Sequence, residues 1–232
     1  FSLTQMTPMK LQKILVILLY SMALVCPLLS IAQSIADADG HTYTSVKINQ
    51  QVWLGQNLNT GHFRNGDPIP EVTTDEAWEK AGNEQKPAWC YYENSTDHGK
   101  TYGKLYNWYA VNDPRGLAPK GYHIPTVQDW NTMSSYLGGG EKAGGKLKEK
   151  GLTHWKSPNT EAANSSGWNG LPGGLNYSFG TFVGLGSTGY WWTSVEDGEV
   201  TANVYALSFE NSTLLDLFLN KGVGLSVRCI KD

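Results

Sequence analysis

One stretch of this chain, residues 121–130, constrains the fold more than any other. It reads Gly-Tyr-His-Ile-Pro-Thr-Val-Gln-Asp-Trp. Thr126 is a good N-cap residue and Asp129 follows three positions later, which is the capping-box pattern of a helix start. Apolar side chains then recur at helical spacing, at Trp130, Met133 and Leu137. Three glycines at 138–140 can end the helix, so the sequence predicts a helix that begins after Thr126 and turns one face to a core.

Strand patterns lie on both sides of this helix. Residues 41–48 alternate polar and apolar side chains, and residues 51–54 can return as the second strand of a hairpin. Near the C-terminus, four segments are interpreted as a terminal antiparallel set: 190–195, 202–209, 214–219 and 224–230. The order of a hairpin, helices, a long loop region and a meander predicts an α+β fold in one domain, with two main helices packed on small antiparallel sheets.

Further segments are assigned between these landmarks. The pattern at residues 73–76 predicts a short helix that includes Trp78, and residues 87–92 read as a buried extended segment. A polar loop is expected over 94–100. A second main helix is expected over 102–111, because its apolar residues share a face at Leu105, Trp108 and Tyr109. Residues 141–150 can add one or two helical turns.

Residues 151–189 are dominated by Gly, Asn, Ser and Pro. A loop of that length within a compact domain is usually functional or packed by its own side chains. Five residues could supply that packing: Trp155, Trp168, Leu171, Tyr177 and Phe179. The chain has nine Trp and twelve Tyr but only 17% charged residues, which excludes a coiled coil and favours a loop-rich fold with large rings in its core.

The first 32 residues predict an export signal. Lys10 and Lys13 precede an apolar run over 14–29, and Ser30-Ile31-Ala32 fits a cleavage site. Residues 33–40 are interpreted as a linker and 41–232 as the folded domain. The apolar run of about 16 residues is short for a stable membrane span. A lipoprotein anchor at Cys26 is less favoured, because Val25 stands where a small residue normally precedes a lipidated cysteine.

The charge pattern excludes some partners. The formal net charge is −3 and no run of Lys or Arg is present, so nucleic acid is not expected as a partner. A pI near 6.0 also argues against electrostatic capture by an anionic membrane.

Several motifs occur together along most of the chain. They are Val52-Trp53-Leu54 and the segments 102–109, 117–126, 143–148, 171–174, 190–194 and 226–229. In this order they resemble the Fibrobacter succinogenes major paralogous domain, a secreted bacterial domain with a C-type-lectin-like fold. The helix start and the Val227-Arg228 strand also resemble the wider formylglycine-generating-enzyme and C-type-lectin-like superfamily. The resemblance implies a secreted or outer-surface protein of a Gram-negative bacterium.

Loss of the signal would leave two cysteines, Cys90 and Cys229. An oxidising compartment favours a disulfide between them, and closing a loop of about 140 residues would contribute about 4–5 kcal/mol. The alternative is two buried free thiols. Many relatives have a cysteine at the position of Ala118 that can pair with the terminal cysteine, so the resemblance implies Cys90 as the partner of Cys229 here.

No catalytic constellation is visible in the sequence. There is no Gly-x-Ser-x-Gly elbow, and the five histidines lack metal-type spacing. Formylglycine-generating chemistry needs a pair of copper-binding thiols in an active cleft. Only two cysteines remain after the signal, and Cys229 lies in the terminal strand, where a structural disulfide is expected. We therefore expect no enzymatic activity. Because C-type-lectin-like domains often bind calcium through loop acids, Asp97, Asp113 and Asp197 are candidate calcium ligands, with solvated turn acids as the alternative.

Ligand binding is expected instead, at a face built from the terminal strands. Its candidate residues are Trp191, Trp192, Tyr205, Asn203, Asn211 and Asp216. Of the adjacent Trp191 and Trp192, one should face the core and the other lie nearer the surface. The alternative is that these rings only fill the core. The hypothesis is a lectin-like domain that binds a glycan or a protein; the rivals are a structural or adhesive surface domain and a divergent enzyme of the formylglycine-generating superfamily.

Overall fold

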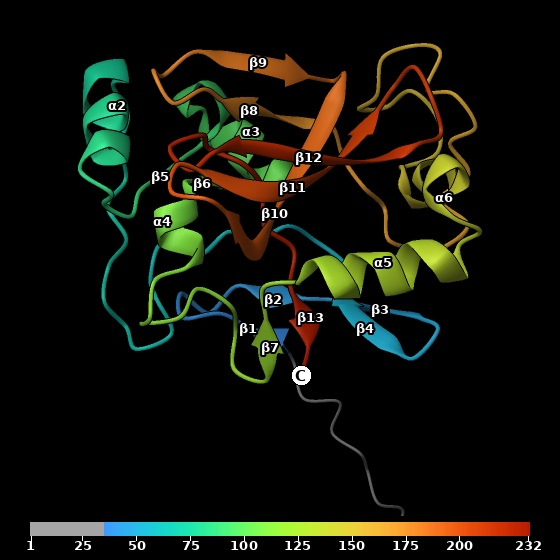
Figure 1. Cartoon of the computed structure of the whole chain (residues 1–232), viewed down its shortest axis with the longest axis horizontal. Coiled ribbons are helices and arrows are strands. Elements are labelled where there is room, and N and C mark those ends of the chain that lie inside the picture. The colour runs from blue at the N-terminus through green and yellow to red at the C-terminus, as the bar shows by residue number, and fades with distance from the viewer. Residues whose placement is uncertain (1–34) are drawn as a thin grey trace, which may run out of the picture. The chain divides into compact units, whose positions relative to one another are not determined.

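The computed structural model describes residues 35–232 (Figure 1). The predicted signal peptide, its cleavage site and Cys26 lie outside the described residues, as does the start of the predicted linker. Residues 35–40 of that linker belong to the fold, because Ile35–Ala36 pair with Thr42–Tyr43. Within residues 35–232, no helix has the length and apolar character needed to cross a membrane.

Five strands form the largest sheet. They are β8 (Gly173–Asn176), β9 (Phe182–Leu185), β10 (Thr188–Asp197), β11 (Thr201–Ser208) and β12 (Leu214–Asn220). Their order across the sheet is β12–β11–β10–β8–β9. The β8–β10 pair is parallel and meets at Gly174 and Gly189, whereas the other pairs are antiparallel. This sheet is therefore mixed, and the prediction of purely antiparallel sheets is wrong here.

Shorter strands form the remaining sheets. They are β1 (Ile35–Ala36), β2 (Thr42–Tyr43), β3 (Ser45–Ile48), β4 (Gln51–Leu54), β5 (Trp89–Cys90), β6 (Leu105–Tyr106), β7 (Tyr122–His123) and β13 (Ile230–Lys231). A four-stranded sheet has the order β3–β4–β13–β7, and two pairs, β1–β2 and β5–β6, complete the set. The predicted hairpin is confirmed as β3 and β4, with Val46 opposite Trp53.

Helices lie around these sheets (Figure 1). They are α2 (Asp75–Asn83), α3 (Thr96–Tyr102), α4 (Trp108–Val111), α5 (Val127–Tyr136), α6 (Gly140–Leu147) and the 3-10 helix η2 (Tyr92–Asn94). The capping box of α5 is confirmed. The Asp129 N–H donates to Thr126 Oγ1 at 3.2 Å, and the Thr126 N–H donates to the Asp129 carboxylate at 2.8 Å. Helices and sheets together confirm the predicted α+β class.

The continuous helix predicted over residues 102–111 is wrong. The preceding segment, predicted as a polar loop, forms α3, and Gly103 ends that helix with a φ of 76°. A Cβ at Gly103 would lie 2.6 Å from the Leu58 carbonyl oxygen, so this close approach requires glycine. Residues 105–106 then pair with β5, and the Asn107 side chain caps α4. The apolar spacing that resembled one helix comes from two separate buried elements.

The terminal segment also departs from the prediction. Residues 224–229 form only isolated bridges, to residues such as Tyr106 and Trp191, instead of a strand beside β12. β13 follows them and joins β4 and β7 in the other sheet. The last residues of the chain therefore cross between the two sheets and pack on both, which explains why residues 223–230 are all buried.

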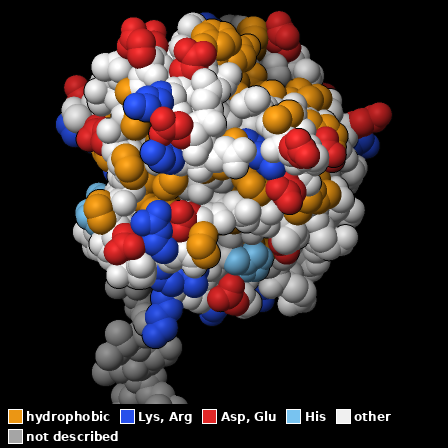
Figure 2. All heavy atoms as spheres, turned by 60° about the vertical axis from the view of Figure 1, so that its left-hand side comes forward, with side chains coloured by type: hydrophobic (Ala, Val, Ile, Leu, Met, Phe, Trp, Pro, Cys, Tyr) orange, Lys and Arg blue, Asp and Glu red, His pale blue; other side chains and the backbone are white. Residues whose placement is uncertain are grey.

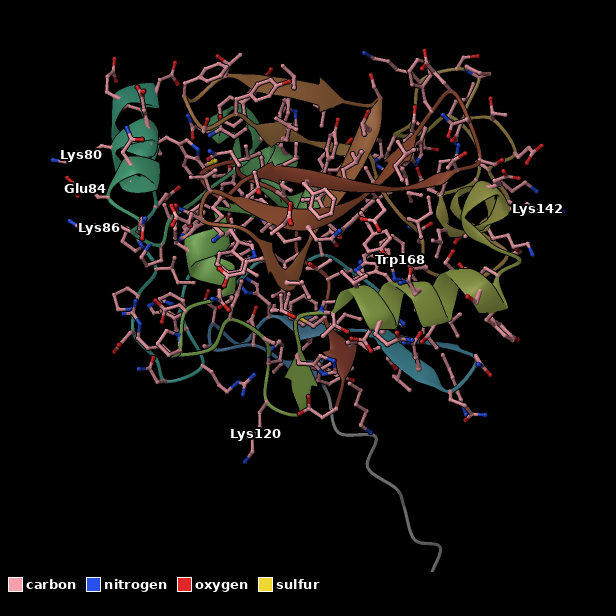
Figure 3. All side chains as sticks on the ribbon, viewed as in Figure 1. Lys80, Glu84, Lys86, Lys120, Lys142 and Trp168 are labelled. Carbon is pink, nitrogen blue, oxygen red and sulfur yellow. The ribbon has the colours of Figure 1, made fainter. Side chains whose placement is uncertain are left out.

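Tryptophan rings fill the space between α5, β4 and the large sheet. Trp168 lies between α5 and this sheet (Figure 3). Its ring centroid is 4.9 Å from that of Trp191, 5.5 Å from Trp130 and 6.3 Å from Trp53, all in edge-on arrangements. Such edge-to-face pairs are favourable beyond the area they bury. The segment 151–189, predicted as one long loop, thus contains two strands, β8 and β9, and its irregular part before them contributes the Trp168 ring to the centre of the core.

Buried cations hold the loops in place. Each lies against a tryptophan ring: Lys104 on Trp89 at 4.2 Å, Lys148 on Trp155 at 5.6 Å, Lys221 on Trp108 at 4.7 Å and Arg228 on Trp168 at 4.0 Å. The Lys148 ammonium also donates to the carbonyls of Thr160, Ser208 and Asn211 at 2.7–2.9 Å. Carbonyls that no strand satisfies therefore have a charged donor instead, which is how a loop-rich chain meets its backbone hydrogen-bonding needs.

Candidate functional site

The aromatic face predicted on the terminal strands is not accessible. Trp191 and Trp192 are both fully buried and Tyr205 is 2% exposed. The expectation that one of the two tryptophans faces the surface is wrong, because β10 is an interior strand with both faces covered. Trp191 packs in the tryptophan cluster, while the Trp192 indole N–H donates to the Tyr106 carbonyl at 2.8 Å on the other side. The alternative interpretation, rings that fill the core, holds for all three.

Of the polar residues predicted for that face, one is buried and two are exposed. Asn203 is buried and its amide hydrogen-bonds the carboxylate of Asp216. Asp216 and Asn211 are exposed. The Asn211 side chain accepts from the Thr213 N–H at 3.0 Å, so it closes a turn. The structure therefore does not gather the six predicted ligand-binding residues into one surface.

The three candidate calcium ligands do not form a cluster, and two of them pair with a cation. Asp97 pairs with Lys100 at 2.7 Å and Asp113 with Arg115 at 2.8 Å. Asp197 ends β10, where its carbonyl accepts from the Thr201 hydroxyl. Among residues 35–232, a metal-type cluster is formed by other residues, Asp37, Asp39 and His41, and none of the three predicted acids belongs to it.

Hydrogen bonds join the residues of this cluster to each other and to neighbouring residues at the start of the fold. The Asp37 carboxylate accepts from the Tyr43 hydroxyl at 2.5 Å and from the backbone N–H of His41 at 2.9 Å. Asp39 accepts from the Gly61 N–H and contacts the His62 ring. Burial raises the pKa of Asp39, but these hydrogen bonds outweigh it and hold that pKa below its usual value. The hydrogen bonds of the two carboxylates therefore hold the β1–β2 loop against residues 59–62, which is a structural role.

The predicted disulfide is absent. Cys90 and Cys229 are both buried free thiols. Cys90 lies in β5 among Trp78, Ala88, Tyr92 and Leu105, whereas Cys229 packs in the main core cluster. The two thiols therefore belong to different parts of the core, and the alternative of buried free thiols replaces the predicted bond.

A thiol count tests this correction. Burial raises the pKa of the Cys90 thiol to about 12, and burial also raises that of Cys229, so neither thiolate forms in the folded protein. We expect the chain 33–232 to show no reaction with an aromatic disulfide reagent at pH 8 when native. In guanidinium without reductant, both thiols should react. A count of zero in both conditions would instead demonstrate that a disulfide forms.

An open groove lies beside α2, on the side of the molecule that Figure 2 turns toward the viewer. Its volume is about 250 Å³. The groove is lined by residues of α2 and the loop after it, of α4, of the β8–β9 and β10–β11 turns, and of the end of β12 and the residues after it: Glu79, Gly82, Asn83, Gln85, Tyr109, Ser178, Phe179, Val200, Asn220 and Gly222. Among them Glu79 alone is charged, so the groove suits a neutral polar ligand better than an ion.

Phe179 lines this groove, and the Tyr177 ring stacks on it outside the lining. Tyr177 and Phe179 stack with their centroids 5.2 Å apart and an angle of 9° between their planes. Phe179 is 54% exposed and Tyr177 is 38% exposed. Both rings were predicted to pack within the loop region. They are exposed because they occupy the tight turn between β8 and β9, closed by the Gly180 N–H to the Tyr177 carbonyl at 2.9 Å.

Polar side chains with unused hydrogen-bonding groups among residues 35–232 line the same groove. Within residues 35–232, the side chains of Asn83, Gln85 and Ser178 make no hydrogen bond, and the Asn220 amide uses only its oxygen, toward the Gly222 N–H at 2.8 Å. Their donors and acceptors are therefore available to a ligand. The sequence analysis did not identify these residues, because no sequence pattern distinguishes a loop amide beside an exposed ring from any other loop amide.

The floor of the groove is rigid. The Trp78 indole N–H, in α2, donates to the Gly222 carbonyl at 3.0 Å and holds the helix to the end of β12. Gly82 and Gly222 meet there, and a Cβ at Gly82 would lie 3.3 Å from Gly222 Cα. Lys221 is buried and its ammonium pairs with Glu196 at 2.8 Å. The groove is thus preformed, which lowers the entropic cost of binding.

The fold defines this protein as a loop-rich α+β domain built on a mixed five-stranded sheet and a smaller second sheet, with one rigid polar groove flanked by exposed rings. The model of the family described as Fibrobacter succinogenes major domain matches residues 46–231, and the chain belongs to this family. No curated protein and no solved structure matches the chain significantly.

Proposed function

We propose that this chain is a secreted or outer-surface lectin-like domain of C-type-lectin-like fold that binds a neutral glycan, without enzymatic activity, at the groove beside α2. The observation that carries the proposal is the exposed Tyr177–Phe179 pair next to unengaged amides. Exposed rings cost free energy in water unless a partner covers them. The C–H face of a sugar ring can cover them while its hydroxyls bond to Asn83, Gln85 and Asn220.

The location outside the inner membrane rests on the signal peptide that the sequence predicts. The structural or adhesive role remains the rival. The enzyme alternative gains no support, because Cys90 and Cys229 are buried in different clusters and have raised pKa values, whereas its chemistry requires paired accessible thiols. Calcium is not part of the proposed site, since Glu79 is its sole acid.

Binding by the chain 33–232 to a panel of neutral polysaccharides tests the proposal, with calcium and with a chelator. We expect Phe179→Ala to weaken binding about tenfold or more, because central aromatic contacts commonly contribute about 2 kcal/mol or more. Phe218→Ala is the matched control, since Phe218 is 56% exposed but does not line the groove. The chelator should change nothing.

Each result decides between the roles. Loss of affinity in Phe179→Ala together with unchanged affinity in Phe218→Ala supports the groove as the glycan site. Equal loss in both variants contradicts its location. No binding by the unmodified chain to any polysaccharide in either condition removes the glycan hypothesis and leaves the structural or adhesive role in first place.

A further inference from the structure

A second pocket, separate from the groove, has basic residues in its lining and no acidic ones. It has a volume of about 260 Å³ and lies between β2, the residues after β4, the C-terminal part of α3 and residues 169–171. Its cationic side chains are Lys100 and Arg228; His41 also lines it, with its ring nitrogen 3.1 Å from the Asp37 carboxylate. The groove beside α2 shows the opposite pattern, with one acid and no base. Such a concentration of positive charge in a concave site favours an anionic ligand.

Arg228 is a buried cation without a counter-anion among residues 35–232. It is 1% exposed, and none of the described acids forms an ion pair with it. Burial lowers the pKa of its guanidinium to about 9, so the group stays charged at neutral pH although burial disfavours the charge. A buried charge of this kind is costly unless other groups compensate it.

The guanidinium is only partly satisfied within the protein. Its Nε and Nη2 both donate to Asn57 Oδ1, at 3.1 and 2.8 Å, and Nη1 donates to the Trp168 carbonyl. A guanidinium carries five N–H groups, so two of them have no acceptor among the described residues. Carboxylate and phosphate oxygens both match the planar fork of a guanidinium, and a carboxylate does so in a single plane.

Asn169 adds a donor to the same pocket. Its backbone N–H donates to Asn164 Oδ1, and its own Oδ1 accepts from Asn164 Nδ2, both at 2.9 Å. This reciprocal pair fixes the side-chain amide and leaves its Nδ2 group without a partner among residues 35–232. Lys100 is available too, because its ion pair with Asp97 is exposed and such pairs are weak.

We propose that this pocket binds a small organic carboxylate of about the size of one acidic monosaccharide. Arg228 and Lys100 supply the charge, and Asn169 supplies a fixed neutral donor. The volume is just below the range of about 300–1,000 Å³ typical of small-molecule sites, which limits the ligand to one ring. The inference does not depend on glycan binding at the groove, because the two sites share no lining residue.

A titration of the chain 33–232 with glucuronate tests the proposal, with glucose as the neutral control. The readout is the NMR signals of the Asn169 side-chain amide and the Arg228 Nε–H group. We expect saturable shifts with glucuronate and none with glucose. Inorganic phosphate is the third probe, because it has the charge but not the planar carboxylate.

Asn169→Asp is the decisive variant. It keeps the Oδ1 acceptor for Asn164 but replaces the free donor with a negative charge, and we expect it to weaken glucuronate binding about tenfold or more, since hydrogen bonds to charged groups contribute about 1.5–3 kcal/mol. Lys100→Glu, on the exposed surface of α3, is a second variant with the same expected direction. Asn83→Asp and Phe179→Ala, both in the groove, should leave glucuronate affinity unchanged.

Any one of four results overturns the proposal. The first is that glucuronate gives no saturable shift, the second that glucose gives the same shift, and the third that both Asn169→Asp and Lys100→Glu retain full affinity. The fourth is tighter binding of phosphate than of glucuronate, because it assigns the pocket to phosphate ligands. Loss of polysaccharide binding in Phe179→Ala leaves this inference untouched, so the failures of the two sites are distinguishable.

Discussion

We expect Trp168→Ala to lower the free energy of unfolding by about 3–5 kcal/mol, the cost typical of removing a large buried ring. Trp168 is fully buried and contacts the rings of Trp53, Trp130 and Trp191 edge-on. Arg228 also lies 4.0 Å above it, so the alanine variant leaves a cavity next to a buried charge. Guanidinium unfolding followed by far-UV circular dichroism measures the change without relying on tryptophan fluorescence.

Two variants bracket this prediction. Trp168→Phe keeps an aromatic face under Arg228 and should lose clearly less stability than the alanine variant. Tyr136→Ala removes a ring that is 60% exposed on α5 and should change stability by about 0.5 kcal/mol or less. If Trp168→Ala behaved like Tyr136→Ala, the tryptophan cluster would not be the centre of the core.

Lys148→Met should lower the free energy of unfolding by about 3–5 kcal/mol as well, because hydrogen bonds from a charged donor contribute about 1.5–3 kcal/mol each and its three acceptors are partly buried. The Lys148 ammonium donates to three carbonyls, those of Thr160, Ser208 and Asn211. These carbonyls come from the long loop region and from the turn before β12. Methionine fills a similar volume but donates no hydrogen bond, so the loss reports on the charge and its hydrogen bonds.

Lys142→Met is the matched control for Lys148→Met. Lys142 lies on α6, one turn and a half before Lys148, and its side chain points away from the fold (Figure 3). We expect its replacement to change stability by about 0.5 kcal/mol or less. Equal stability of the two methionine variants would show that the loop region does not depend on the buried ammonium.

Buried rings and buried cations stabilise the loop region of this fold together. Strands satisfy backbone groups with other strands, but residues 151–172 have few such partners. Trp155 and Trp168 fill the space that regular elements would occupy, and Lys148 and Arg228 supply donors to loop carbonyls. Packing and hydrogen bonding from side chains thus replace regular structure, which explains why rings and buried cations occur in pairs.

Features that depend on neighbouring residues were predictable from the sequence. The capping box at Thr126 and Asp129, the β3–β4 hairpin and the helical turns after Gly140 all follow from residues within a few positions of each other. The family also followed from motifs in a fixed order. Such signals are local, so the sequence contains them in full.

Exposure was decided by the tertiary structure alone. Trp191 and Trp192 are buried because β8 and β11, distant in sequence from each other, flank β10 and other elements cover both faces. Tyr177 and Phe179 are exposed because they fall in a turn rather than in the core. The separation of Cys90 from Cys229 depends in the same way on long-range contacts, as does the lack of an acid paired with Arg228 in the part of the chain that the structure describes. A sequence specifies which side chains are apolar or charged, but only packing determines which of them remain available to a ligand.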